Sequence, residues 1–166
     1  MPNIAIMKIS TYHKAQGHDV DWYNPVIDIM DTDILYECQL FNFTAPYQYY
    51  PVRAKIIRGG TGVDIKSHLP KEIEQILELD YSLYPDCDYS MQFFSRGCIR
   101  NCHFCVVRDK EGYIHEVEPM LLNPKGKHIE VLDNNFFANP NWNKAVDYII
   151  NTGQKVSLHG VDYGYL

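Results

Sequence analysis

"HIEVLDNNFFANPNWNKAVDYIINTGQKVSLHG", residues 128–160, is the stretch that most constrains how this chain folds. The apolar run at 129–132 predicts a strand, and the segment after it predicts a helix that Asn139 can cap and Gly153 can end. The apolar face of that helix comprises Trp142, Ala145, Val146 and Ile149. A second run, 155–161, predicts another strand. Strand, helix and strand in this order indicate an α/β fold with parallel strands.

Two polar segments follow strands in this half of the chain. Residues 89–94, "YSMQFF", predict a third strand directly before a cysteine-rich loop, and Asp133-Asn134-Asn135 follows the strand at 129–132. Parallel α/β sheets place their chemistry in the loops at the carboxyl ends of strands. We therefore expect the cysteine loop and the Asp-Asn-Asn segment at such ends.

The first half of the chain predicts a second set of shorter elements. These are a helix ending at Gly17, strands at 19–23, 34–44 and 54–57, a glycine-rich turn at 59–62 and a short helix within 68–79. The glycine-rich turn lacks the Lys-Ser/Thr pair of a phosphate-binding loop, which favours a purely structural turn. Residues 80–90, "DYSLYPDCDYS", are rich in turn formers and predict a linker between the two halves.

The composition is that of an ordinary globular protein. The chain has 166 residues, of which 46% are hydrophobic and 22% charged, so it can bury a core. Its net charge of −6 argues against nucleic-acid binding through phosphate neutralisation. We find no run of about 18 apolar residues to span a membrane. The N-terminus does not show the charged leader, apolar run and small-residue cleavage site of a signal peptide in that order. The five cysteines, an odd number, indicate reduced thiols and a cytoplasmic location.

The cysteine loop, "RGCIRNCHFC" at residues 96–105, carries the clearest functional pattern, with Cys98, Cys102 and Cys105 within eight residues. A structural zinc site needs four ligands, so Cys87 or His103 would have to complete it. A redox dithiol would use only the Cys102-x-x-Cys105 pair. Both remain open as alternatives: the zinc site needs a fourth ligand from outside the three cysteines, and the dithiol leaves Cys98 unused.

An iron–sulfur cluster uses all three thiols. A [4Fe–4S] cube normally takes four thiolates, and a cube held by three has one iron open to a ligand that is not protein. Such an arrangement suits a small molecule that must bind iron and receive an electron. The spacing of the three cysteines lets one compact loop reach three corners of the cube, which favours this interpretation.

The motif Cys98-x-x-x-Cys102-x-x-Cys105, with Phe104 before the last cysteine, resembles that of the radical S-adenosylmethionine (SAM) superfamily. "SRGCIRNCHFCVV" is similar to the branch that carries a cobalamin-binding-like, or flavodoxin-like, region before its barrel. "PNIAIMKISTYHKAQGHDV", "GGTGVDI" and "LPKEI" also resemble members of that branch, so the likeness covers nearly the whole chain.

The resemblance implies a function and site residues. It implies a [4Fe–4S] cluster on Cys98, Cys102 and Cys105, with SAM on the fourth iron and an external electron donor. SAM would be cleaved reductively to a 5′-deoxyadenosyl radical that acts on an unknown substrate. Backbone near Phe104 would contact the adenine, and Asp133 or Asn134 would accept from the SAM amino group. Two alternatives remain: a non-catalytic iron–sulfur electron-transfer or sensor protein, or truncated remnant; and a zinc-stabilised interaction module.

The resemblance also implies an architecture. It divides the chain into a partial flavodoxin-like region, 1–80, and a partial radical SAM βα barrel of three strands, 81–166, with the cluster loop at 95–108. The family's barrel has about six βα units, so the chain is expected to be truncated. The sequence lacks an Asp-x-His-x-x-Gly motif, so we expect no cobalamin.

Overall fold

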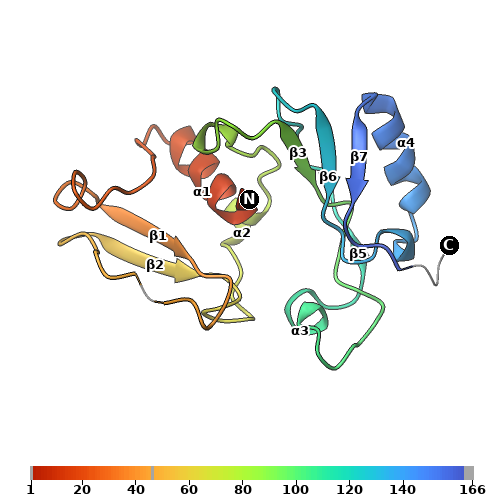
Figure 1. Cartoon of the computed structure of the whole chain (residues 1–166), viewed down its shortest axis with the longest axis horizontal. Coiled ribbons are helices and arrows are strands. Elements are labelled where there is room, and N and C mark those ends of the chain that lie inside the picture. The colour runs from red at the N-terminus through yellow and green to blue at the C-terminus, as the bar shows by residue number, and fades with distance from the viewer. Residues whose placement is uncertain (1, 46, 163–166) are drawn as a thin grey trace.

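A three-stranded parallel sheet, in the order β3-β6-β7, lies at the centre of the larger part of the molecule (Figure 1). The computed structural model describes residues 2–45 and 47–162. The strands are β3 (Tyr89–Gln92), β6 (His128–Val131) and β7 (Lys155–Leu158). Their register places Ser90 opposite Ile129 and Ile129 opposite Val156. All three strands, and their parallel direction, were predicted from the sequence.

Helix α4 (Trp142–Thr152) connects β6 to β7 and covers one face of this sheet. The core on that face consists of Phe94, Ile129, Val131, Phe136, Ala145 and Ile149. Gly153 ends the helix in the left-handed region at φ 65°, as predicted. The predicted cap is wrong, because the helix begins after Asn141. Asn139 is buried instead, and its side-chain oxygen accepts from the Asn141 amide at 3.0 Å.

Helix α1 (Ile4–Ala15) covers the opposite face of the sheet, so α1 and α4 lie on opposite sides of the strands (Figure 1). Its Met7 packs in a cluster with Leu79, Met91 and Met120. Asn3 caps the helix by accepting from the Ile6 amide at 3.2 Å. A helix from the first half of the sequence therefore packs on the sheet of the second half. The division at residue 80 stays a prediction.

A second, two-stranded parallel sheet lies apart from the first (Figure 1). It consists of β1 (Ile34–Cys38) and β2 (Lys55–Gly59), both shifted or shortened relative to the predicted strands. The strand predicted at 19–23 is wrong, since residues 18–24 have no regular structure. Among residues 2–45 and 47–162 no strand pairs with this segment, and Trp22 donates its indole N–H to the Leu83 carbonyl at 2.8 Å.

Several short elements complete the fold. They are α2 (Lys71–Glu74), α3 (Val107–Glu111), the 3₁₀ turns η1 (Tyr81–Leu83) and η2 (Phe136–Ala138), and an antiparallel pair of β4 (Ser95–Arg96) with β5 (His115–Glu116). The chain is thus a mixed α/β protein with small parallel sheets, and residues 2–45 and 47–162 form no closed barrel. Within the same residues, we find no helix that combines the length and apolar character required to span a membrane.

Candidate functional site

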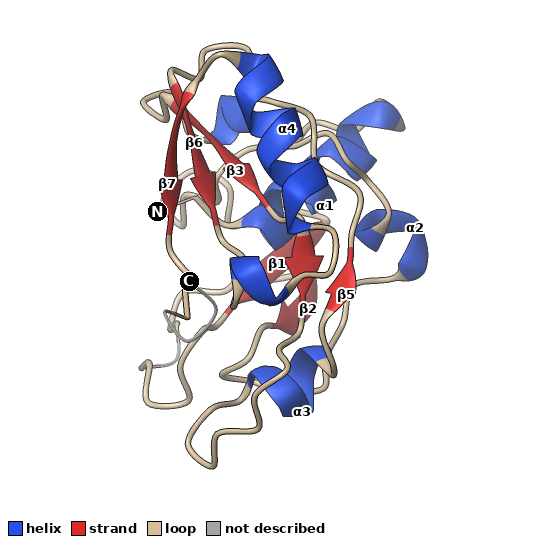
Figure 2. Cartoon of the chain, turned by 90° about the vertical axis from the view of Figure 1, so that its right-hand side faces the viewer, coloured by secondary structure: helices blue, strands red, loops and turns tan. Residues whose placement is uncertain are grey.

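In the structure the cysteine loop comprises residues 97–106, because Arg96 belongs to β4 and α3 begins at Val107. It leaves β4 near the carboxyl end of β3 and leads into α3 (Figures 1 and 2). The start of the loop is tied to the end of α3, because the Cys98 amide donates to the Gly112 carbonyl at 3.3 Å. Gly97 has a φ of 78°, and a Cβ at this position would lie 2.5 Å from the Tyr113 carbonyl oxygen. Only glycine fits where the loop closes.

The three cysteines of the loop are free thiols. Cys98 and Cys105 are half-buried and Cys102 is exposed. The Cys105 amide donates to the Cys102 carbonyl at 3.0 Å, which defines a β-turn, and such a turn holds its first and fourth Cα atoms within about 7 Å. The Arg100 amide donates to the Cys98 sulfur at 3.4 Å. The local backbone therefore brings the Cα atoms of Cys102 and Cys105 close together and directs an amide donor at the Cys98 sulfur.

The loop does not present a finished set of metal ligands. Among the described residues, no group of three or more His, Cys, Asp or Glu side chains is arranged to hold a metal ion. A metal or cluster held by all three thiols would require them to converge from the positions that the structure gives them. The donor set itself, three free thiols on a loop fixed at both ends, has the soft-ligand chemistry that iron–sulfur clusters take.

The two candidates for a fourth zinc ligand do not complete a site. Cys87 precedes β3, so it lies at the amino end of that strand, whereas the loop lies beyond the carboxyl end. Four residues of strand, at about 3.3 Å each, separate the two ends. The Cys87 thiol instead contacts the Tyr89 carbonyl at 3.5 Å. His103 is exposed in the turn, with its ring edge-on to Phe104.

Of the residues predicted to contact SAM, Phe104 lies in the turn between Cys102 and Cys105, with 79% of its surface exposed. Its ring lies edge-on to that of His103 and is otherwise mostly in contact with solvent. The residue at which the adenine contact is predicted is therefore accessible, in the turn between two of the three cysteines.

Asp133 is placed differently, in the interior at the carboxyl end of β6. Its carboxylate accepts from the Phe94 amide at 2.8 Å and from the Ser95 hydroxyl at 2.5 Å. Burial raises the pKa of Asp133, an effect that these donors only partly offset. Both carboxylate oxygens already hold the chain as it leaves β3, which assigns Asp133 a structural contact at this edge of the sheet.

Asn134 is the predicted residue that the structure brings to the loop. Its side-chain nitrogen donates to Glu111 Oε2 at 2.8 Å and lies 3.5 Å from the Gly97 carbonyl. The segment after β6 and the cysteine loop therefore touch directly, as expected for loops at the same edge of a parallel sheet. Next to it, the buried Asn135 Oδ1 has no hydrogen-bond partner in the part of the chain that the structure describes.

Glu111 is the residue that the sequence did not reveal. It accepts from Arg96 at 2.6 Å and from the Gly97 amide at 2.9 Å. Burial raises the pKa of Glu111, but the Arg96 charge and the surrounding donors outweigh burial and lower it overall. Only its charge, opposite to that of Arg96, marks it in the sequence.

Two further arginines anchor the loop: Arg108 donates to the Cys98 carbonyl at 3.0 Å, and Arg100 pairs with Asp162 at 2.7 Å.

The glycine-rich turn has a structural role. A Cβ on Gly60 would lie 2.4 Å from the Gln39 carbonyl oxygen, and one on Gly62 would lie 2.5 Å from the backbone of Phe41. The Gly62 amide donates to the Gln39 carbonyl, so it is not free to bind a phosphate. Thr61 accepts from Lys110 of α3 at 2.6 Å, which connects the turn to the helix after the cysteine loop.

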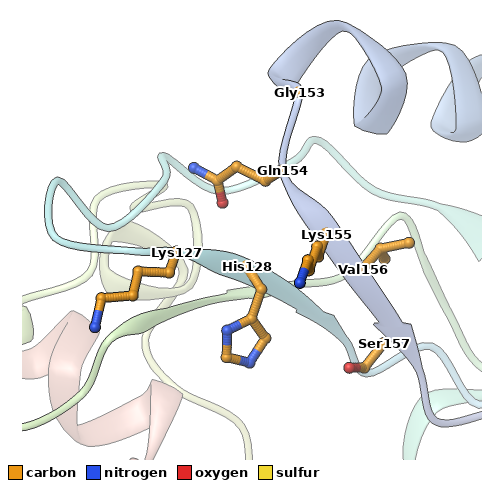
Figure 3. A pocket seen from close by; sticks show the side chains of 7 residues that line it. All are labelled: Lys127, His128, Gly153, Gln154, Lys155, Val156 and Ser157. Atoms are coloured by element: carbon orange, nitrogen blue, oxygen red, sulfur yellow. The ribbon is translucent and has the colours of Figure 1, made fainter.

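A surface hollow lies elsewhere on the molecule. Its lining consists of Lys127, His128, Gly153, Gln154, Lys155, Val156 and Ser157 (Figure 3). These residues gather where β6 and β7 begin, which is the opposite end of the sheet from the cysteine loop. None of the predicted site residues lines it, and we place the candidate site at the loop.

Comparisons with protein-family models, with curated proteins and with solved structures found no match. The functional argument therefore rests on the residues of the loop and on the geometry around them.

Proposed function

We propose that this chain binds a [4Fe–4S] cluster through Cys98, Cys102 and Cys105 and acts as a radical SAM protein. One observation carries the proposal: three free thiols share a short loop, fixed at both ends, at the carboxyl edge of a parallel sheet. The motif resemblance adds the expectation of SAM as the partner of the cluster. The substrate is open, and an external donor supplies the electron.

The residues present suit this cofactor. Of the five cysteines, all within the described residues, three lie in the loop at this edge of the sheet. This number matches a cube in which one iron is not bound by the protein. The chemistry that such a cluster would supply when bound is one-electron reduction of SAM, which breaks the bond between sulfur and the 5′ carbon and yields methionine and a 5′-deoxyadenosyl radical. A reducing compartment such as the cytoplasm keeps the thiols available for assembly.

The chain's own residues orient the site. Arg108 fixes the carbonyl of Cys98, and the Arg100 amide donates to the Cys98 sulfur, a contact that tunes thiolates bound to iron. Asn134 uses its nitrogen toward Glu111, so its side-chain oxygen is the part of the amide suited to accept from an ammonium group. Asp133 acts indirectly, by holding the chain at Ser95 immediately before the loop.

The finer architecture is also a proposal. The unit β3-β6-α4-β7 corresponds to the first part of a radical SAM barrel, because its strands are parallel and the cysteine loop follows the first of them. The region with α1, β1 and β2 corresponds to a reduced flavodoxin-like region, with its two parallel strands and glycine turn.

Anaerobic reconstitution with iron and sulfide tests the proposal. We expect a brown protein with thiolate-to-iron charge-transfer absorbance, and 5′-deoxyadenosine after addition of SAM and a strong reductant. Cys102→Ala removes the exposed thiol and should abolish both signals. Zinc uptake without iron uptake would reject the cluster and favour the zinc-stabilised module.

A non-catalytic iron–sulfur protein is the second candidate. The observation that favours it is the openness of the site: Cys102 and Phe104 are exposed, and the described strands form no closed barrel around the loop. Radical chemistry needs a site that excludes water. An intact cluster that yields no 5′-deoxyadenosine would favour electron transfer or sensing over SAM cleavage.

A further inference from the structure

Glu111, the last residue of α3, joins three segments of the chain through one carboxylate. Its Oε1 accepts from the Arg96 guanidinium at 2.6 Å. Its Oε2 accepts from the Gly97 amide at 2.9 Å and from the Asn134 amide group at 2.8 Å. These donors belong to β4, to the start of the cysteine loop and to the segment after β6. With 15% of its side chain exposed, Glu111 is largely shielded from water.

The negative charge of Glu111 is compensated by the groups that contact it. Burial alone raises the pKa of Glu111, but the Arg96 cation and the Gly97 and Asn134 donors lower it overall, so the group is ionised at neutral pH. Arg96 is itself fixed, because its guanidinium lies over the Phe93 ring at 4.2 Å. Charge-assisted hydrogen bonds in such a shielded site are shorter and stronger than those between neutral groups.

We propose that Glu111 is a positioning residue that holds the cysteine loop and the segment after β6 as one unit. The other closures, from Cys98 to Gly112 and from Arg108 to Cys98, lie within residues 98–112. Glu111 reaches across to Asn134 at 2.8 Å, and among the described residues the other hydrogen bond of the Asn134 side chain is the longer one, at 3.5 Å, to the Gly97 carbonyl. The effect of Glu111 on a bound cluster rests on the proposed function, whereas its role in joining the two segments does not.

Hydrogen exchange on the iron-free protein tests directly whether Glu111 joins the cysteine loop to the segment after β6. Glu111→Gln keeps the size of the side chain but removes the charge and places an amide nitrogen against donors. Amide exchange in residues 97–106 and 133–136 should rise by about tenfold or more, while β6 stays protected. Asp109→Asn, an exposed change of the same charge on the same helix, should leave both segments as in the wild type. Unchanged exchange in either segment of the Glu111→Gln variant would overturn the proposal.

Asn134→Ala provides a second test that leaves the Arg96–Glu111 pair in place. Exchange should rise at 133–136, and adding Asn134→Ala to Glu111→Gln should raise it there little further, because both changes break one connection. This variant decides the question even if Glu111→Gln does not fold. Full additivity of the two changes, or unchanged exchange at 133–136 in Asn134→Ala, would contradict the proposal.

The reconstituted protein gives a separate measurement. Glu111→Gln should retain less iron after gel filtration than Asp109→Asn and should change the electron paramagnetic resonance spectrum of the reduced cluster. Equal iron retention and identical spectra in the two variants would show that Glu111 does not position the thiols. Failure of the wild type to take up iron would reject the proposed function, whereas the exchange data on the iron-free protein would still decide the role of Glu111.

Discussion

The two parallel sheets of this chain differ in how they are covered. The β3-β6-β7 sheet is packed by α1 on one face and α4 on the other, and Met91, Ile129 and Val131 are almost completely buried. The β1–β2 pair leaves Ile34 and Ile56 exposed at 40% and 37%. Parallel sheets normally have both faces covered. The stability of the chain should therefore reside in the three-stranded sheet, which also carries the cysteine loop.

Truncating the core of the larger sheet should have the largest effect. Phe136→Ala, at a residue with 1% exposure, should lower the free energy of unfolding by about 3–5 kcal/mol. Ile56→Ala in β2 should cost less than about 1 kcal/mol, because its side chain is already partly in water. Denaturant titration followed by circular dichroism measures both. Equal losses would show that the two sheets are covered alike in solution.

The contacts of α1 with Asp80, the residue before η1, should be next in size, and they depend on pH. Burial raises the pKa of Asp80, but donors from Lys14, Ser10 and Ser82 outweigh it and bring the pKa to about 2, below the ordinary value of 3.8 for this side chain. A lowered carboxyl pKa stabilises the fold above pH 3.8, and this contribution is lost as the pH falls toward 2.

Asp80→Asn should therefore cost about 1–2 kcal/mol at pH 7, and the difference from the wild type should shrink as the pH falls from 3.8 toward 2. Asp86→Asn, an exposed change nearby, serves as the matched control and should be neutral. Urea unfolding at a series of pH values gives the result. A difference that is independent of pH would show that the charge of Asp80 is not what holds α1.

Removing the hydrogen bond between α3 and the glycine-rich turn should have the smallest effect on the free energy of unfolding. Lys110→Met removes the hydrogen bond to Thr61, and because Lys110 is half-buried we expect a loss of about 0.5–1 kcal/mol. Thr61→Val removes the same contact from the other side and should give a similar loss, with little further loss in the double variant. Additive losses would mean that the two side chains act separately.

The sequence predicted the elements whose patterns are long and local. The strand, helix and strand of residues 128–160 were predicted because apolar periodicity and Gly153 act within the segment itself. The short β4, β5 and α3 have too few residues to show a period. The strand predicted at 19–23 failed because pairing depends on a partner strand, which the sequence pattern does not specify.

The candidate site divides in the same way. The three cysteines were identified from their spacing alone, whereas Glu111 acquires its role from Arg96 and Asn134, which lie 15 and 23 positions away. The burial of Asp133 likewise depends on how β3 and β6 pair. Spacing predicts ligands that lie on one loop, and tertiary contacts decide which residues position them.

Iron content after anaerobic reconstitution, compared between Cys102→Ala and Cys87→Ala, tests the central claim most directly. Both variants remove one thiol, but Cys102 lies in the loop and Cys87 at the other end of β3. The account predicts about four irons per chain for the wild type and for Cys87→Ala, and a loss of the cluster in Cys102→Ala. Full iron content in Cys102→Ala, or loss of iron in Cys87→Ala, would contradict it.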